Sequence, residues 1–195
     1  MDKEILLLVN HGSRLYGLHH ADSDYDTFKV LSTPPVANRF GAVRKKNGTH
    51  VVAGANDDTV FDYKTFLIHV YNGVPQALEA MFAKDAIIDR IPSYRKSYHA
   101  SVGVMANSYT RQIENFAHGT MKRRRHALRY ALNLREAVER GGRFSPELSQ
   151  DNIDFVKEAA SSERYVAELR KVSVFEINVD EVLIRENIAA DKEES

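Results

Sequence analysis

Residues 5–30 read ILLLVNHGSRLYGLHHADSDYDTFKV, and this stretch decides the fold. It opens with a continuous apolar run, Ile5–Val9, that has the length and composition of a buried strand. Gly12–Ser13 follows closely, and residues 14–18 can form a short helix. Residues 23–30 then mix aspartates with Tyr, Thr, Phe and Val, which predicts a second strand. The stretch therefore predicts a strand, a glycine turn, a helix and a strand.

The second predicted strand carries a pair of carboxylates. Asp24 and Asp26 are two residues apart, so on a strand their side chains leave on the same face. Their oxygens can then converge on one divalent cation, and Mg²⁺ is a hard cation that takes such ligands. The bland alternative is that both aspartates are turn or capping residues, because Ser-Asp clusters commonly mark loops.

The glycine turn offers groups that can hold a phosphate. Gly12 lets the backbone approach a phosphate closely, and Ser13 presents a hydroxyl and an N–H at the predicted start of the helix. Arg14 either donates to the same phosphates or faces solvent. A triphosphate would thus lie between Ser13 and a cation held by the carboxylates.

The rest of the chain predicts a change from strands to helices. Residues 59–63 read as a strand, and 38–58 as a hairpin or an ordered loop. Strand signals almost vanish after the break at Ile91–Pro92. The predicted helices cover 64–72, 75–82, 98–117, 121–140, 151–160 and 163–172. This is an α+β organisation, which we divide into a catalytic core, 1–92, and a helical region, 93–195, that completes the substrate cleft.

Basic residues gather in the predicted helix at 121–140. Lys122, Arg125 and Arg129 share one face of that helix at i, i+3 and i+7 spacing. This face is either simply solvated, or it contacts a triphosphate or a nucleic-acid backbone as Arg and Lys clusters do. The whole chain has 27 basic and 27 acidic residues, so its net charge predicts no polyanionic partner.

Composition excludes several classes of protein. The chain has no cysteine, which rules out disulfides, thiolate zinc sites and cysteine nucleophiles. Apolar residues make up 43% and charged residues 28%, which is the balance of a folded globular protein. The run Ile5–Val9 is too short for a signal segment or a membrane span, so we expect a cytoplasmic protein without a membrane partner. Amphipathic helices in the second half offer an interface for an oligomer.

Two motifs and their spacing resemble a known superfamily. The sequence has Val9-Asn10-His11-Gly12-Ser13, ten intervening residues, and then Asp24-Tyr25-Asp26. This is similar to the Gly-Ser and Asp-x-Asp signature of the DNA polymerase beta nucleotidyltransferases, above all to a prokaryotic and phage family associated with RNA ligases. The likeness continues in KTFL at 64–67, NGVP at 72–75, LEAMF at 78–82 and HALR at 126–129.

The resemblance implies the fold, the metal and the donor. It implies a mixed sheet flanked by helices, dependence on Mg²⁺ with Mn²⁺ as a substitute, and an NTP donor, for which we expect ATP. By position Asp62 matches the third metal-binding acid of the family, and Asp58 is the fallback. Asp24, Asp26 and Asp62 would then bind the metal ions, and Asp62 would also help to deprotonate the acceptor. The alternative for Asp62 is the N-terminal cap of a helix.

Three residues depart from the family pattern or from an ordinary core. His11 stands where the family usually has an apolar or small residue, and Thr27 where it usually has an aliphatic one. Glu79 lies among apolar neighbours, so we expect a partly buried acid that pairs with a base.

The favoured function is an enzyme that transfers a nucleoside monophosphate from an NTP to an acceptor hydroxyl and releases pyrophosphate. An RNA end is one candidate acceptor, although a protein side chain or a small molecule fits the same chemistry. The alternative is a catalytically silent member of the fold that senses nucleotide, or binds nucleic acid or protein. Retention of all the acids argues against it, because clustered carboxylates repel one another without cations.

Overall fold

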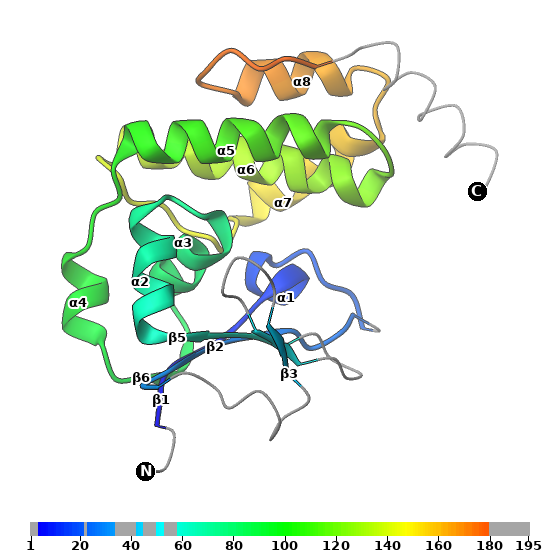
Figure 1. Ribbon diagram of the computed structural model, residues 1–195. Helices are drawn as coiled ribbons and strands as arrows, with labels where there is room; N and C mark the ends of the chain where they lie inside the picture. The colour runs from blue at the N-terminus through cyan, green and yellow to red at the C-terminus, as the bar shows by residue number, and fades with distance from the viewer. Residues whose placement is uncertain (1–3, 22, 34–41, 45–49, 53–57, 180–195) are drawn as a thin grey trace. The chain divides into compact units, whose positions relative to one another are not determined.

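The computed structural model describes residues 4–21, 23–33, 42–44, 50–52 and 58–179 (Figure 1). The chain forms two compact units. Unit 1 comprises Met1–His99 with Ser145–Glu147, and unit 2 comprises Ala100–Phe144 with Leu148–Ser195. The functional roles predicted for 1–92 and 93–195 stay predictions. In the described part of the chain, no helix has the length and apolarity needed to cross a membrane.

Unit 1 is built on a mixed sheet. The described residues contribute six strands: β1 (Ile5–Asn10), β2 (Thr27–Leu31), β3 (Ala42–Arg44), β4 (His50–Val52), β5 (Asp58–Asp62) and β6 (Ala86–Asp89). Their order across the sheet is β3-β4-β5-β2-β1-β6. The central pair β2–β5 is parallel, and the other pairs are antiparallel. The predicted mixed sheet is confirmed.

Two helices of unit 1, α2 (Tyr63–Tyr71) and α3 (Pro75–Phe82), lie on the same side of the sheet (Figure 1). The unit also contains α1 (Gly12–Tyr16) and α4 (Pro92–Ser97). Phe28 of β2 stacks on Phe61 of β5 with ring centroids 5.0 Å apart, and Phe66 of α2 meets Phe28 at 5.9 Å. All three rings are buried. Each fully buried ring contributes about 1.5–3 kcal/mol, so these contacts hold the helical layer on the sheet.

Unit 2 is helical, as predicted. Its helices are α5 (Val102–Ala117), α6 (Met121–Glu139), α7 (Gln150–Ser161) and α8 (Tyr165–Val172). The buried residues of α5 are Met105, Tyr109, Ile113 and Ala117, which form a stripe at intervals of four. Ser101 caps this helix by accepting a bond from the Val104 N–H. The helix therefore begins at Val102 and not at 98, because the backbone is extended at Tyr98 and Ser101.

Candidate active site

The turn between β1 and α1 brings a carboxylate against a glycine. Gly12 has a φ of +63°, in the left-handed region that favours glycine. The N–H of His11 donates to the carbonyl of Asp26 at 2.9 Å. A Cβ added at Gly12 would lie 2.5 Å from Oδ2 of Asp26, which is closer than real Cβ atoms approach. The Asp26 carboxylate therefore packs on the backbone of Gly12, and a side chain at residue 12 would displace it.

The predicted strand at 23–30 begins later than expected. β2 starts at Thr27, so Asp24 and Asp26 lie in the segment that enters the strand. The alternation of side chains along a strand therefore does not bring them together, and that part of the prediction is wrong. Asp26 is positioned by Gly12 instead. The side chain of Asp24 is exposed, and that of Asp26 is half-buried.

Arg14 organises the segment that carries these aspartates. Its Nε donates to the carbonyl of Asp24 at 3.1 Å, and its Nη2 donates to the carbonyl of Ser23 at 2.7 Å. The guanidinium carbon also lies 3.4 Å from the centroid of the Tyr25 ring. Because the guanidinium is engaged in these contacts, binding a phosphate would compete with its hold on the segment.

Asp62 is the N-terminal cap of α2. Its Oδ1 accepts from the Thr65 N–H at 2.9 Å, and its Oδ2 accepts from the Thr65 hydroxyl at 2.6 Å. Burial by itself would raise the pKa of Asp62, but these bonds and a backbone bond from Lys64 outweigh it and lower the pKa. Both carboxylate oxygens are thus occupied by the helix that follows.

The register of the parallel pair separates Asp62 from the other two aspartates. Thr27 pairs with Asp58, whereas Leu31 pairs with Asp62. Four residues of strand span about 13 Å. Asp62 therefore stands at the far end of the pair, and the fallback Asp58 begins β5 beside the residue that follows Asp26. Among the side chains that the structure describes, no three of His, Asp or Glu converge into a metal site.

A buried polar cluster supports the glycine turn from α3. Glu79 is fully buried, and its Oε2 accepts a bond from the Tyr16 hydroxyl at 2.7 Å. Nε2 of His11 lies 3.7 Å from the same oxygen. The His11 ring also packs on Phe28, with centroids 5.9 Å apart. The sequence marks both residues, Glu79 as an acid among apolar neighbours and His11 as an unusual residue at its position. It does not indicate that the two side chains meet.

The three basic residues predicted to share a helix face have different surroundings on α6. Lys122 is exposed, Arg125 is half-buried and Arg129 is fully buried. Nη2 of Arg125 lies 3.3 Å from Sδ of Met121, and the guanidinium carbon of Arg129 lies 4.2 Å from the Tyr130 ring centroid. The three residues therefore do not form one solvated face, because their exposure differs along the helix.

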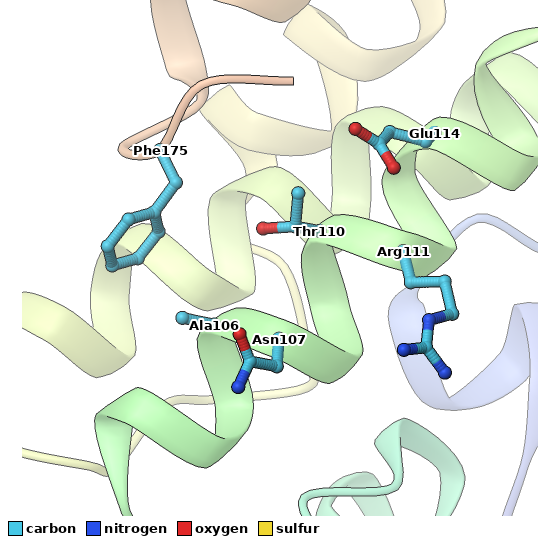
Figure 2. A pocket seen from close by; sticks show the side chains of 6 residues that line it. All are labelled: Ala106, Asn107, Thr110, Arg111, Glu114 and Phe175. Atoms are coloured by element: carbon cyan, nitrogen blue, oxygen red, sulfur yellow. The ribbon is translucent and has the colours of Figure 1, made fainter. Parts of the chain in front are cut away.

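Unit 2 has a pocket of its own. Its volume is about 300 Å³, and it is lined by Ala106, Asn107, Thr110, Arg111, Glu114 and Phe175. Figure 2 shows the first five along α5 and Phe175 on a different segment of the chain. None of the predicted site residues lines this pocket. The predicted chemistry therefore rests on the β1–α1 turn and not on this pocket.

A glycine turn packed against an aspartate, on a mixed sheet flanked by helices, is the arrangement expected of a nucleotidyltransferase of the DNA polymerase beta type. The chain belongs to the RNA repair pathway DNA polymerase beta family (RlaP), whose sequence model matches residues 1–185. A comparison with curated proteins finds no match. The predicted resemblance is confirmed, because the family match spans both units.

Proposed function

We propose that the protein is a metal-dependent enzyme that transfers a nucleoside monophosphate from an NTP to an acceptor hydroxyl and releases pyrophosphate. The observation that carries this proposal is the contact between Gly12 and Asp26, with 2.5 Å between a hypothetical Cβ and Oδ2. It places a carboxylate suited to a hard cation against the glycine that begins α1. The family description favours an RNA end as the acceptor.

Asp24, Asp26 and Asp58 are the proposed ligands of Mg²⁺, or of Mn²⁺ in its place. Carboxylate oxygens suit these cations, and Asp58 takes the third position because it begins β5 opposite Thr27. Asp62 is better suited to its role as a helix cap, since Thr65 engages both of its oxygens. Bound divalent cations would neutralise charge on the phosphates and on the attacking oxygen.

Residues of the turn are proposed to hold the donor. The N–H of Ser13 lies in the first turn of α1, where backbone N–H groups have no partner within the helix. This N–H and the Ser13 hydroxyl would bind the terminal phosphates of the NTP, with ATP as the expected donor. The acceptor oxygen then bonds to the α-phosphorus, the bond to the bridging oxygen breaks, and the hydroxyl proton passes to a carboxylate or to water.

Basic residues of α6 are proposed to serve the acceptor rather than the donor. Lys122 is exposed and suited to an RNA phosphate. Arg129 is buried, so its role is more readily structural. Arg125 is intermediate between an RNA contact and a structural residue, since it is half-buried and contacts Met121.

The test is transfer of label from each α-labelled NTP to RNA, protein and small-molecule acceptors, with Mg²⁺ or Mn²⁺. The Asp24→Asn/Asp26→Asn variant should lose at least about 1,000-fold, since cation ligands supply several kcal/mol of charge stabilisation. Asp62→Asn is the matched control and should keep transfer, because asparagine also caps helices. Metal-dependent NTP binding without transfer to any acceptor would favour the nucleotide-sensing alternative. Transfer that survives in the double variant would refute the proposed site.

A further inference from the structure

The residue between the two proposed metal ligands is an exposed aromatic. Tyr25 keeps 58% of its surface exposed, although Asp26 beside it is half-buried against Gly12. An exposed tyrosine by itself is ordinary. What distinguishes Tyr25 is its position, because its ring begins one residue from each of two carboxylates that the proposed function assigns to the cation.

Arg14 fixes the ring of Tyr25 from one side. The guanidinium carbon is 3.4 Å from the ring centroid, which is a stacking distance. The guanidinium is itself held by the carbonyls of Ser23 and Asp24 at 2.7 and 3.1 Å. The ring is therefore ordered before any ligand arrives, which lowers the entropic cost of binding to it. Although Arg14 stacks on the ring, Tyr25 as a whole stays 58% exposed.

We propose that Tyr25 is a stacking platform for a nucleobase at the catalytic turn, with Arg14 as its positioning residue. This inference rests on the proposed function and adds a base-binding residue to it. Every nucleobase has a π-face, so stacking on Tyr25 tolerates different bases. The base belongs either to the NTP or to the terminal nucleotide of the RNA acceptor, because both approach the same carboxylates.

The exposed tyrosine Tyr71 supplies a matched control. It lies at the end of α2 and is 59% exposed, close to the 58% of Tyr25, but no guanidinium stacks on it among the described residues. Its ring instead lies 5.9 Å from that of Tyr98, and its hydroxyl accepts a bond from the Tyr94 hydroxyl at 3.0 Å. Tyr71→Leu thus removes an equally exposed ring from a tyrosine cluster away from the turn.

The experiment measures three affinities of the full chain with Mg²⁺: for ATP, for inorganic tripolyphosphate, and for a single-stranded oligoadenylate. Tripolyphosphate presents the phosphates without a base. Tyr25→Leu should weaken either ATP or oligoadenylate by roughly 5- to 150-fold, the range of stacking on one base, and leave tripolyphosphate unchanged. Tyr25→Phe keeps the ring and should bind like the wild type, as should Tyr71→Leu.

Each outcome separates this inference from the proposed function. Loss for ATP alone assigns the base to the donor, and loss for oligoadenylate alone assigns it to the acceptor. Unchanged affinity for both in a folded Tyr25→Leu variant overturns the stacking role and leaves the proposed function standing. Equal weakening of tripolyphosphate also overturns it, since the effect would then come from the phosphate site. If the wild type binds neither ATP nor tripolyphosphate, the proposed function fails and this inference fails with it.

Discussion

The two ends of the parallel pair β2–β5 carry aspartates with opposite surroundings. At the end where both strands begin, Asp26 packs on Gly12, and Asp58 pairs with Thr27. At the other end Asp62 pairs with Leu31 and closes the first turn of α2 through Thr65. The proposed function assigns the carboxylates of the first end to a cation, whereas the Asp62 carboxylate starts a helix. The residue type is the same, so under this proposal the register decides the role.

Replacing Asp58, the proposed third metal ligand, and Asp62, the helix cap, should give the largest difference in transfer activity between the two ends of the β2–β5 pair. Asp58→Asn should lower transfer by about 100-fold or more, because a lost ligand charge removes several kcal/mol of stabilisation. Asp62→Asn should leave transfer within about 2-fold, since its oxygens serve Thr65 and the amide replaces the cap. The measurement is kcat/KM for label transfer over a range of Mg²⁺ concentrations.

A variant of the neighbouring residue Asp57 extends this comparison. It lies outside the described residues and precedes Asp58 in the chain. If Asp57→Asn abolishes transfer and Asp58→Asn does not, the third ligand is the residue before Asp58 in the chain. If Asp62→Asn alone abolishes transfer, the assignment by register is wrong.

The choice between Asp58 and Asp62 shows what the sequence could predict here and what it could not. Local patterns were sufficient for β1, for the turn at Gly12 and for the helices of unit 2, because apolar periodicity and caps act within a few residues. The third acid depends on how β5 pairs with β2, which is a contact across about 30 residues. Strand register is set by packing of the whole sheet, so position along the chain alone favours Asp62, whereas the register favours Asp58.

Contacts between residues far apart in the chain also explain why the sequence does not predict the cluster around Glu79 or the burial of arginines on α6. Tyr16 and Glu79 are 63 residues apart in the chain and meet only in the folded unit. Arg124 is 1% exposed and donates to the carbonyl of Ala160 at 3.4 Å, although it lies in a run of four basic residues. A charge run predicts a solvated face unless a partner helix supplies acceptors. Helical spacing identifies which residues share a face, but not what covers it.

A methyl group at the glycine turn should give the next largest effect. Gly12→Ala adds a Cβ that meets Asp26 Oδ2 at 2.5 Å, so the carboxylate must move. We expect a loss of roughly 10- to 100-fold in kcat/KM, since a displacement of about 1 Å in a reacting group can cost 100-fold. Any strain from the positive φ adds to this effect and lowers stability by about 1–2 kcal/mol.

Gly141→Ala is the control that separates backbone strain from displacement of the Asp26 carboxylate. Its φ of +61° nearly equals the +63° of Gly12, but an added Cβ would meet nothing within 4 Å. Gly141→Ala should therefore lose about 1–2 kcal/mol of stability and keep its transfer activity. Equal activity losses in the two alanine variants would mean that strain, and not the position of Asp26, controls the site.

Removing the Asp62 carboxylate, at the far end of the β2–β5 pair, should lower stability and give the smallest of the expected effects. Asp62→Ala removes the cap of α2 and should lower the free energy of unfolding by about 1 kcal/mol at pH 7 while transfer persists. The folded pKa of Asp62 is lowered from its usual value of 3.8. Its stabilisation is therefore fully present above the unfolded pKa and lost as the pH falls through the lower folded pKa.

Urea denaturation of the wild type and of Asp62→Ala should thus give a stability difference that is constant from pH 7 to pH 5 and shrinks below about pH 4. Ser149→Ala removes the cap of α7, where the capping group is a hydroxyl that accepts the Asn152 N–H at 3.3 Å. Its stability difference should persist into the acid range. A difference for Asp62→Ala that also persists in acid would mean that the ionised carboxylate is not what caps α2, and the contrast between the two ends would then rest on register alone.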